Sequence, residues 1–365
     1  MLSYFPNLDG LRFLAAFGVM IHHTEQLKAM WQLPNCWDNA CVGLLGKLGV
    51  VLFFVLSGFL ITYLLLAEER KYGSIRLRRF YMRRILRILP LYYLILAVAW
   101  WVLPNIALFA SPHFDYSAFD RHLFLQGCLY ILVLPNWAMP ISGGIPYATH
   151  TWSIGTEEQF YVIWPCLLRR VVYHRLYLLG GIVLGYQVVI CLLQSSWAVQ
   201  YLPYATLFRS FWASFMVPCM AIGGFYAVLL FRQHAFLRIL MRSVIGYSLL
   251  AILGLLLGFG VKFPYFHYEI YALLFGGIIL HLAANPRLGR CMEHSSFRYL
   301  GKISYGLYMY HPIAIVFALQ LLSISTPYSV HWLVYPLSIC LTFALASFSY
   351  RYYESFFLSL KNRFA

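Results

Sequence analysis

The chain has 365 residues, of which 62% are hydrophobic and 11% are charged, and its net charge is +15. A soluble domain is about half apolar and about a quarter charged. This composition therefore excludes a single soluble core and predicts a polytopic membrane protein. The positive residues lie in short stretches between apolar runs, which is the pattern of a topology signal, so we expect a lipid bilayer and not nucleic acid as the partner.

Ten apolar runs are long enough to cross a bilayer, so the expected fold class is all-α with about ten transmembrane helices. The predicted spans are 11–31, 48–67, 88–108, 152–168, 176–195, 211–231, 243–261, 264–283, 303–322 and 330–350. We expect one membrane domain over 1–365, with no cleavable signal peptide and no appended soluble domain.

The charge distribution sets the expected orientation. Segment 68–87 carries eight Lys and Arg residues, which predicts that it is cytoplasmic and that both termini are cytoplasmic too. This orientation holds only if the shorter apolar segment 122–135 does not cross the membrane. We therefore predict a re-entrant or in-plane helix there, walling a cavity.

Two ionisable residues of the first span, Arg12 and His23, share one helix face. They are eleven residues apart, which is three turns plus about 20°, and lie roughly 16 Å apart along the helix axis. A neutral imidazole at membrane depth can take a proton from a hydroxyl or attack an activated acyl group. The alternative is a structural histidine bonded to a neighbouring helix; the arginine on the same face favours the functional interpretation.

A second polar group follows in "HTWSIGTEEQFYVIWP" (150–165), where Glu157 and Glu158 lie early in an apolar segment. One of them could orient the imidazole, as the carboxylate does in a catalytic triad. It could instead neutralise Arg12 or Arg209, or simply mark the start of a span. Consecutive helical residues diverge by about 100°, so at most one of the two points into a shared cavity.

Arginines at the cytoplasmic end of the third span form a candidate anion site. Arg83, Arg84 and Arg87 lie in "FYMRRILRILP" at spacings that place them on neighbouring positions of one helix face. Guanidinium groups in such an array suit phosphates. Attraction to anionic lipid explains the same pattern without a ligand.

Three further features are ambiguous from the sequence. Ser57 and Gly58 within a span predict close helix approach or a local break. His311 precedes a proline that frees a backbone carbonyl, so the imidazole could cap that carbonyl or line a cavity. Cys36 and Cys41 in one polar loop could pair or stay free; no Cys or His spacing predicts a metal site.

Taken together, six stretches occur in an order that resembles the acyltransferase-3 family of bacterial membrane O-acyltransferases. They are "LDGLRFLAAFGVMIHH", "GVVLFFVLSGFLIT", "FYMRRILRILPLYYLIL", "TWSIGTEEQFYVIWP", "ISYGLYMYHP" and "SYRYYESFF". The resemblance implies ten spans in the bacterial inner membrane. It also implies transfer of an acyl group, commonly acetyl, from acyl-CoA to a hydroxyl, usually of a sugar.

The resemblance also implies roles for residues. His23 would be catalytic, with Glu157 or Glu158 beside it. Arg84 and Arg87 would contact the phosphates of coenzyme A, with Arg12 and Arg83 nearby. Its Trp-Ser segment falls on Trp152 and Ser153, which we expect to line the substrate site. From the residues themselves we expect three further candidates to line it, namely Ser57, Arg209 and His311.

The chain departs from the family at two positions, where Val51 replaces a common Asp and Ser355 replaces a common Pro. The expected reaction moves an acetyl group from cytoplasmic acetyl-CoA to a glycan or lipid-linked glycan presented outside. A proton-coupled transporter or flippase is the rival interpretation, because buried Arg, His and Glu also build proton relays. Transporters often contain a repeat that relates the two halves of the chain, and no such repeat is evident in this sequence.

Overall fold

The protein is described by a computed structural model that covers residues 5, 7–109, 122–284, 290–325 and 328–364. These residues form helices and contain no β-strand, so the predicted all-α fold class is confirmed. The longer helices are α1 (Asn7–Met30), α2 (Ala40–Tyr72), α3 (Leu77–Ala97), α7 (Trp152–Arg170), α8 (Arg175–Gln194), α10 (Ala205–Ser214), α11 (Val217–Arg232), α13 (Ser243–Gly258), α14 (His267–Ala284), α16 (Ser304–Ser325) and α17 (Val334–Ser349).

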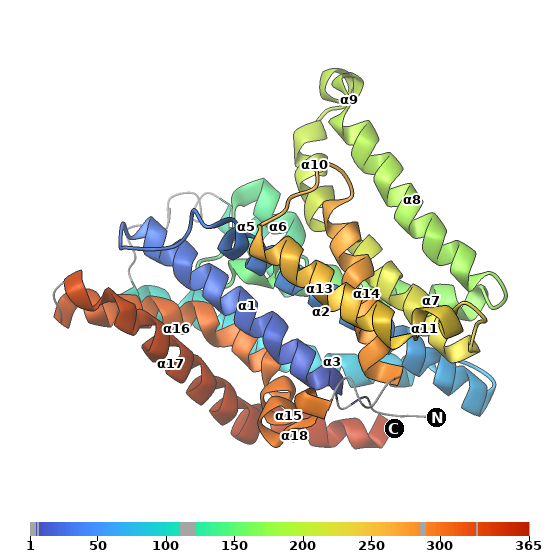
Figure 1. Cartoon of the computed structure of the whole chain (residues 1–365). Helices are drawn as coiled ribbons and strands as arrows, with labels where there is room; N and C mark the ends of the chain where they lie inside the picture. Colours follow the sequence, from blue (N-terminus) through green and yellow to red (C-terminus); the bar gives the residue numbers. More distant parts are fainter. Residues whose placement is uncertain (1–4, 6, 110–121, 285–289, 326–327, 365) are drawn as a thin grey trace. The chain divides into compact units, whose positions relative to one another are not determined.

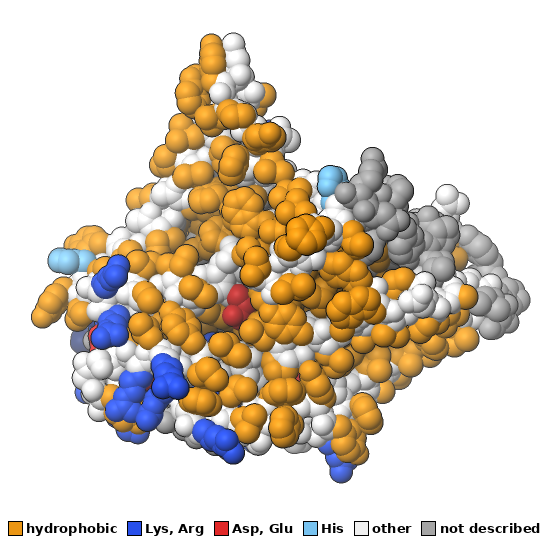
Figure 2. All heavy atoms as spheres, turned by 180° about the vertical axis from the view of Figure 1, so that it is seen from behind, with side chains coloured by type: hydrophobic (Ala, Val, Ile, Leu, Met, Phe, Trp, Pro, Cys, Tyr) orange, Lys and Arg blue, Asp and Glu red, His pale blue; other side chains and the backbone are white. Residues whose placement is uncertain are grey.

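Among the described residues, seven helical stretches are long and apolar enough to cross a membrane. They are Ala40–Tyr72, Leu77–Asn105, Arg175–Gln194, Ala205–Arg232, His267–Ala284, Ser304–Ser323 and His331–Leu360. The chain is therefore a multi-pass membrane protein, and hydrophobic side chains are spread over the face shown in Figure 2. The other three predicted spans fall on α1, α7 and α13, which are charged or short. The count of ten spans therefore stays a prediction.

The predicted non-crossing segment 122–135 is a short helix followed by a turn. Helix α5 (Leu123–Ile131) has nine residues, about 14 Å, which is half of the hydrocarbon thickness. The chain turns at Val133, whose φ is +59°, into α6 (Pro135–Ser142). The buried Gln126 amide donates to the Ser142 carbonyl at 2.9 Å and ties the two helices together.

The chain divides into two compact units. The first contains residues 1–15, 47–77 and 156–301, and the second contains 16–46, 78–155 and 302–365. Helices α1, α2 and α7 contribute residues to both units.

Close backbone packing of α2 against α11 defines the first unit. A Cβ on Gly58 would lie 1.9 Å from the Met220 carbonyl oxygen, and one on Gly223 would lie 2.1 Å from that of Val55. Only glycine fits at these positions, which confirms the close helix approach predicted from the Ser57–Gly58 pair.

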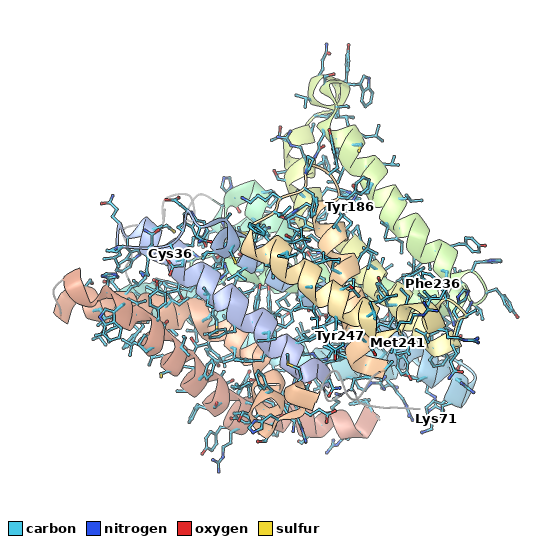
Figure 3. All side chains as sticks on the ribbon, viewed as in Figure 1. Cys36, Lys71, Tyr186, Phe236, Met241 and Tyr247 are labelled. Carbon is cyan, nitrogen blue, oxygen red and sulfur yellow. The ribbon has the colours of Figure 1, made fainter. Side chains whose placement is uncertain are left out.

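A buried ion pair and a splayed helix complete the first unit. Arg175, at the start of α8, donates to Glu69 at 2.7 Å and to the Leu168 carbonyl at 2.9 Å. Figure 1 shows α8 running outward to α9 (Ser196–Tyr201), and its contacts are with α10 and α11. Tyr186, labelled in Figure 3, donates its hydroxyl to the Trp212 carbonyl of α10 at 2.8 Å.

In the second unit α16 and α17 pack along each other (Figure 1). Their apolar contacts include Ile315, Leu319 and Val334, against which Leu27 and Trp31 of α1 also pack. Tyr hydroxyls connect these elements to α3, since Tyr305 donates to the Ile88 carbonyl at 2.9 Å. The second unit is thus built around the C-terminal helices and the second half of α1.

Charged residues in the second half of α1 are paired, which explains how an apolar helix accommodates them. The Tyr335 hydroxyl donates to Glu25, and the Lys28 ammonium donates to the same hydroxyl at 2.5 Å. Both charged side chains are buried. The thiols of Cys36 and Cys41 are free, so these cysteines form no disulfide in this structure.

Candidate active site

The centre of the candidate site is a hydrogen-bonded pair of imidazoles. His23 Nδ1 of α1 lies 2.7 Å from His311 Nε2 of α16, and the two rings are stacked with their planes 9° apart. His311 is fully buried, whereas His23 is half-buried. A half-buried imidazole held by a rigid partner is suited to acid–base or nucleophilic chemistry.

The local sequence explains why His311 is held firmly. Its Nδ1 lies 2.7 Å from the carbonyl oxygen of Tyr308, three residues earlier in the helix. Pro312 lies inside α16 and has no N–H to offer that carbonyl. Of the two alternatives that the sequence leaves open for His311, the structure shows the contact with the carbonyl that the proline frees.

A third histidine completes the cluster. His150, in the single turn η4 (Thr149–Thr151), packs edge-on against His311 with ring centroids 5.2 Å apart. Burial, and in smaller part the nearby His23, lowers the pKa of His150 to about 3, so its ring stays neutral at physiological pH. Among the described residues neither ring nitrogen has a partner in hydrogen-bond geometry, although the Met309 backbone lies close enough to favour the charged form.

Tyr308 ties this cluster to the start of α7. Its hydroxyl donates to the His150 carbonyl at 2.8 Å and lies 2.8 Å from the Ser153 hydroxyl. Ser153 is buried, and its neighbour Trp152 is half-buried. The Trp-Ser segment thus fixes η4, and with it His150, next to His311.

The first unit contains the other half of the predicted constellation. Arg12 donates to Asp9 at 2.7 Å, and its side chain is 35% exposed. The Ser57 hydroxyl donates to Glu157 at 2.8 Å. Glu157 and Glu158 are both half-buried.

Arg12 and His23 lie on one continuous helix, as the sequence predicts. Their separation along the axis is then roughly 16 Å. Arg209 lies on α10 and is exposed.

The arginines of α3 belong to the second unit and lie against its C-terminal segment. Arg83 donates to the Phe364 carbonyl at 2.9 Å, and Arg87 donates to the Lys302 carbonyl at 3.2 Å. Arg84 is half-buried, with its guanidinium above the Phe80 ring.

The family follows from comparison with known proteins. The family model of the acyltransferase-3 acyltransferase domain matches residues 5–351. The chain belongs to the acyltransferase-3 family. No solved structure matches it.

Curated relatives of this acyltransferase-3 chain include three proteins whose names describe O-acetyltransferases. The peptidoglycan O-acetyltransferase OatA of Listeria monocytogenes is 25% identical and covers 97% of this chain and 56% of that protein. The putative peptidoglycan O-acetyltransferase YrhL of Bacillus subtilis is 29% identical, and the match covers 96% of this chain and 54% of that protein. The O-acetyltransferase OatA of Staphylococcus aureus is 27% identical, and the match covers 96% of this chain and 57% of that protein. The chain spans a little over half the length of these relatives.

The structure divides the predicted site residues of the acyltransferase-3 chain between its units. The first unit holds Arg12, Ser57, Glu157, Glu158 and Arg209. The second holds His23, Arg83, Arg84, Arg87, Trp152, Ser153 and His311, of which it brings His23 and His311 into direct contact.

Three residues that contact the candidate site residues are not predicted by the sequence, namely Asp9, His150 and Tyr308. Asp9 is three residues before Arg12, which is the spacing of a helical ion pair. Tyr308 is four residues before Pro312, the position whose carbonyl the proline frees. No comparable signal marks His150, because its neighbours in space come from α16.

Proposed function

We propose that this chain is an integral-membrane O-acyltransferase that moves an acetyl group from acetyl-CoA to a hydroxyl of a glycan. The observation that carries the proposal is the half-buried His23 of α1, which is hydrogen-bonded at 2.7 Å to His311 of α16. Arg12 lies on the same helix as His23. The acyltransferase-3 family and the printed names of the three relatives support the reaction class and a glycan acceptor.

The reaction needs one proton carrier. His23 accepts the proton of the acceptor hydroxyl while the hydroxyl oxygen attacks the thioester carbonyl carbon of acetyl-CoA. The carbon–sulfur bond then breaks, and the thiolate of coenzyme A takes that proton from His23. In the covalent variant His23 attacks the thioester carbonyl carbon first, the carbon–sulfur bond breaks, and coenzyme A leaves as the thiolate. The acceptor hydroxyl oxygen then attacks the acyl-imidazole, the carbon–nitrogen bond breaks, and the hydroxyl proton passes to the imidazole nitrogen and from there to the thiolate.

The donor is placed by its phosphates in this proposal. Arg84 and Arg87 bind them at the cytoplasmic end of α3, and Arg83 and Arg12 add positive charge. The roughly 16 Å between Arg12 and His23 along α1 is comparable to the length of a pantetheine arm. Acetyl-CoA therefore enters from the cytoplasm, and the glycan approaches from the outer side of an inner membrane in which both termini are cytoplasmic.

The roles of the glutamates follow the same division. Glu157 holds the Ser57 hydroxyl at 2.8 Å, and we assign the pair, with Glu158, to supporting the reaction from the first unit. Trp152, Ser153 and Arg209 are assigned to the acceptor.

The test is release of free coenzyme A from acetyl-CoA by the purified full chain, measured together with binding of coenzyme A. His23→Ala should lower release by about 100-fold or more, since general-base catalysis contributes about 10²- to 10⁴-fold, and should keep binding. The double variant Arg84→Ala/Arg87→Ala should lose binding.

Two matched controls make the test specific. His22→Asn keeps a side-chain donor for the Val42 carbonyl that His22 Nδ1 contacts at 2.9 Å, and should keep coenzyme A release. Arg238→Ala removes an exposed positive charge from α12 (Leu237–Leu240) and should keep coenzyme A binding. A wild type that neither binds nor cleaves acetyl-CoA or longer acyl-CoA donors would refute the proposal and favour a transporter.

A further inference from the structure

The protons on the two stacked imidazoles can be assigned from one backbone atom. A carbonyl oxygen only accepts hydrogen bonds. His311 Nδ1 lies 2.7 Å from the Tyr308 carbonyl oxygen, so Nδ1 of His311 carries a hydrogen. In a neutral His311 the proton is then absent from Nε2, which becomes the acceptor.

The second assignment follows from the first. His311 Nε2 lies 2.7 Å from His23 Nδ1. Because Nε2 of the neutral ring has only a lone pair, His23 Nδ1 must be the donor. A neutral His23 with its hydrogen on Nδ1 has its lone pair on Nε2.

Neutrality of His311 follows from its surroundings. The side chain is fully buried, and an imidazolium there would lack a neighbouring carboxylate among the groups that contact it. Among the described residues its contacts include the rings of His23, His150 and Tyr308 and the backbone of Tyr308 and Leu307. Burial of an uncompensated charge is costly.

We propose that His311 is the positioning residue of the acyl transfer, and that it fixes His23 as the tautomer whose reactive nitrogen is Nε2. The inference rests on the proposed function for its catalytic meaning. The sequence suggested that His311 lines the substrate site and that Glu157 or Glu158 orients the imidazole of His23. We now assign the orienting role to His311. A neutral imidazole, anchored by the carbonyl that Pro312 leaves without a backbone donor, takes the place that a carboxylate has in a catalytic triad.

The proton balance of the reaction is simple in this arrangement. Nε2 of His23 takes the hydroxyl proton of the acceptor and later gives it to the thiolate of coenzyme A. The hydrogen on Nδ1 stays in place and its bond to His311 strengthens while His23 is positively charged. His311 thus orients the base without touching a substrate.

Three substitutions separate this role from simple packing. Glutamine places a carbonyl oxygen near the position of Nε2, so His311→Gln keeps the acceptor for His23. Asparagine reaches only the position of Nδ1, so His311→Asn keeps a donor for Tyr308 but loses the acceptor. We expect His311→Gln to keep kcat within about tenfold of wild type, and His311→Asn and His311→Ala to lose about 100-fold with unchanged coenzyme A binding.

The 15N spectrum of histidine-labelled wild type tests the tautomer without any turnover. The signals of His23 are assigned by their absence from His23→Gln, and Nε2 should be the nitrogen that lacks a hydrogen. If His23 instead lacks its hydrogen on Nδ1, or if His311→Asn is as active as His311→Gln, the proposal is overturned. If all three variants are inactive, the spectrum alone decides. An inactive wild type with the expected spectrum would refute the acyltransferase and keep the tautomer assignment.

Discussion

The contact between α2 and α11 gives the most direct prediction about stability. Replacing Gly58 by alanine puts a methyl group 1.9 Å from the Met220 carbonyl oxygen and 2.6 Å from its carbon. Ordinary contact begins at 3.4 Å, so the two backbones must separate by roughly 1.5 Å at this point. The clash is with backbone, so no change of side-chain rotamer relieves it.

The expected cost follows from two opposing terms. Overpacking a close-packed contact costs about 1–3 kcal/mol, and backbone movement places this case at the upper end. Alanine also favours a helix over glycine by about 0.5–1 kcal/mol. We therefore expect Gly58→Ala to lower the free energy of unfolding by about 2 kcal/mol.

A matched control isolates the clash. Gly185 lies in α8, and a Cβ there meets no atom within 4 Å. Gly185→Ala should therefore be neutral or slightly stabilising. The assay is SDS-driven unfolding of the detergent-purified chain, followed by tryptophan fluorescence. If both variants unfold at the same SDS fraction as each other, α2 and α11 are not in backbone contact at Gly58 and the reasoning is wrong.

Three further predictions use the same assay or the coenzyme A assay. Ser57→Ala removes the donor to Glu157 and should lower coenzyme A release more than coenzyme A binding; equal loss of both would contradict a supporting role. Arg175→Met should destabilise by about 3 kcal/mol because it leaves Glu69 and a buried carbonyl without their donor, and an unchanged unfolding midpoint would argue against this pair. Because burial lowers the pKa of His150 from 6.5 to about 3, the unfolded chain binds a proton that the folded chain does not as pH falls below 6.5. The free energy of unfolding should then decrease by at most about 1.4 kcal/mol per pH unit. His150→Phe should lack that part of the slope, and a variant with the wild-type slope would show that His150 does not cause it.

Composition and local pattern determined much about this protein. The excess of apolar residues predicted membrane helices, and the short run before Pro135 predicted a helix too short to cross a bilayer, which agrees with the nine residues of α5. The Ser57–Gly58 pair indicated close helix contact or a local break, and the His311–Pro312 pair indicated a histidine on a freed carbonyl or in a cavity wall; in each case the structure shows the first alternative. Each of these is a property of residues adjacent in sequence or on one helix, where spacing alone fixes geometry.

Tertiary structure alone decided which residues meet across the chain. His23 and His311 are separated by 288 positions, and no helix periodicity relates them. The same holds for His150 beside His311, and for Tyr335 between Glu25 and Lys28. A sequence specifies the face on which an imidazole lies, but the nitrogen that bears its hydrogen depends on the atom opposite it. That atom is supplied by another helix, so the nitrogen of His23 that we propose to react becomes defined only when α1 and α16 pack together.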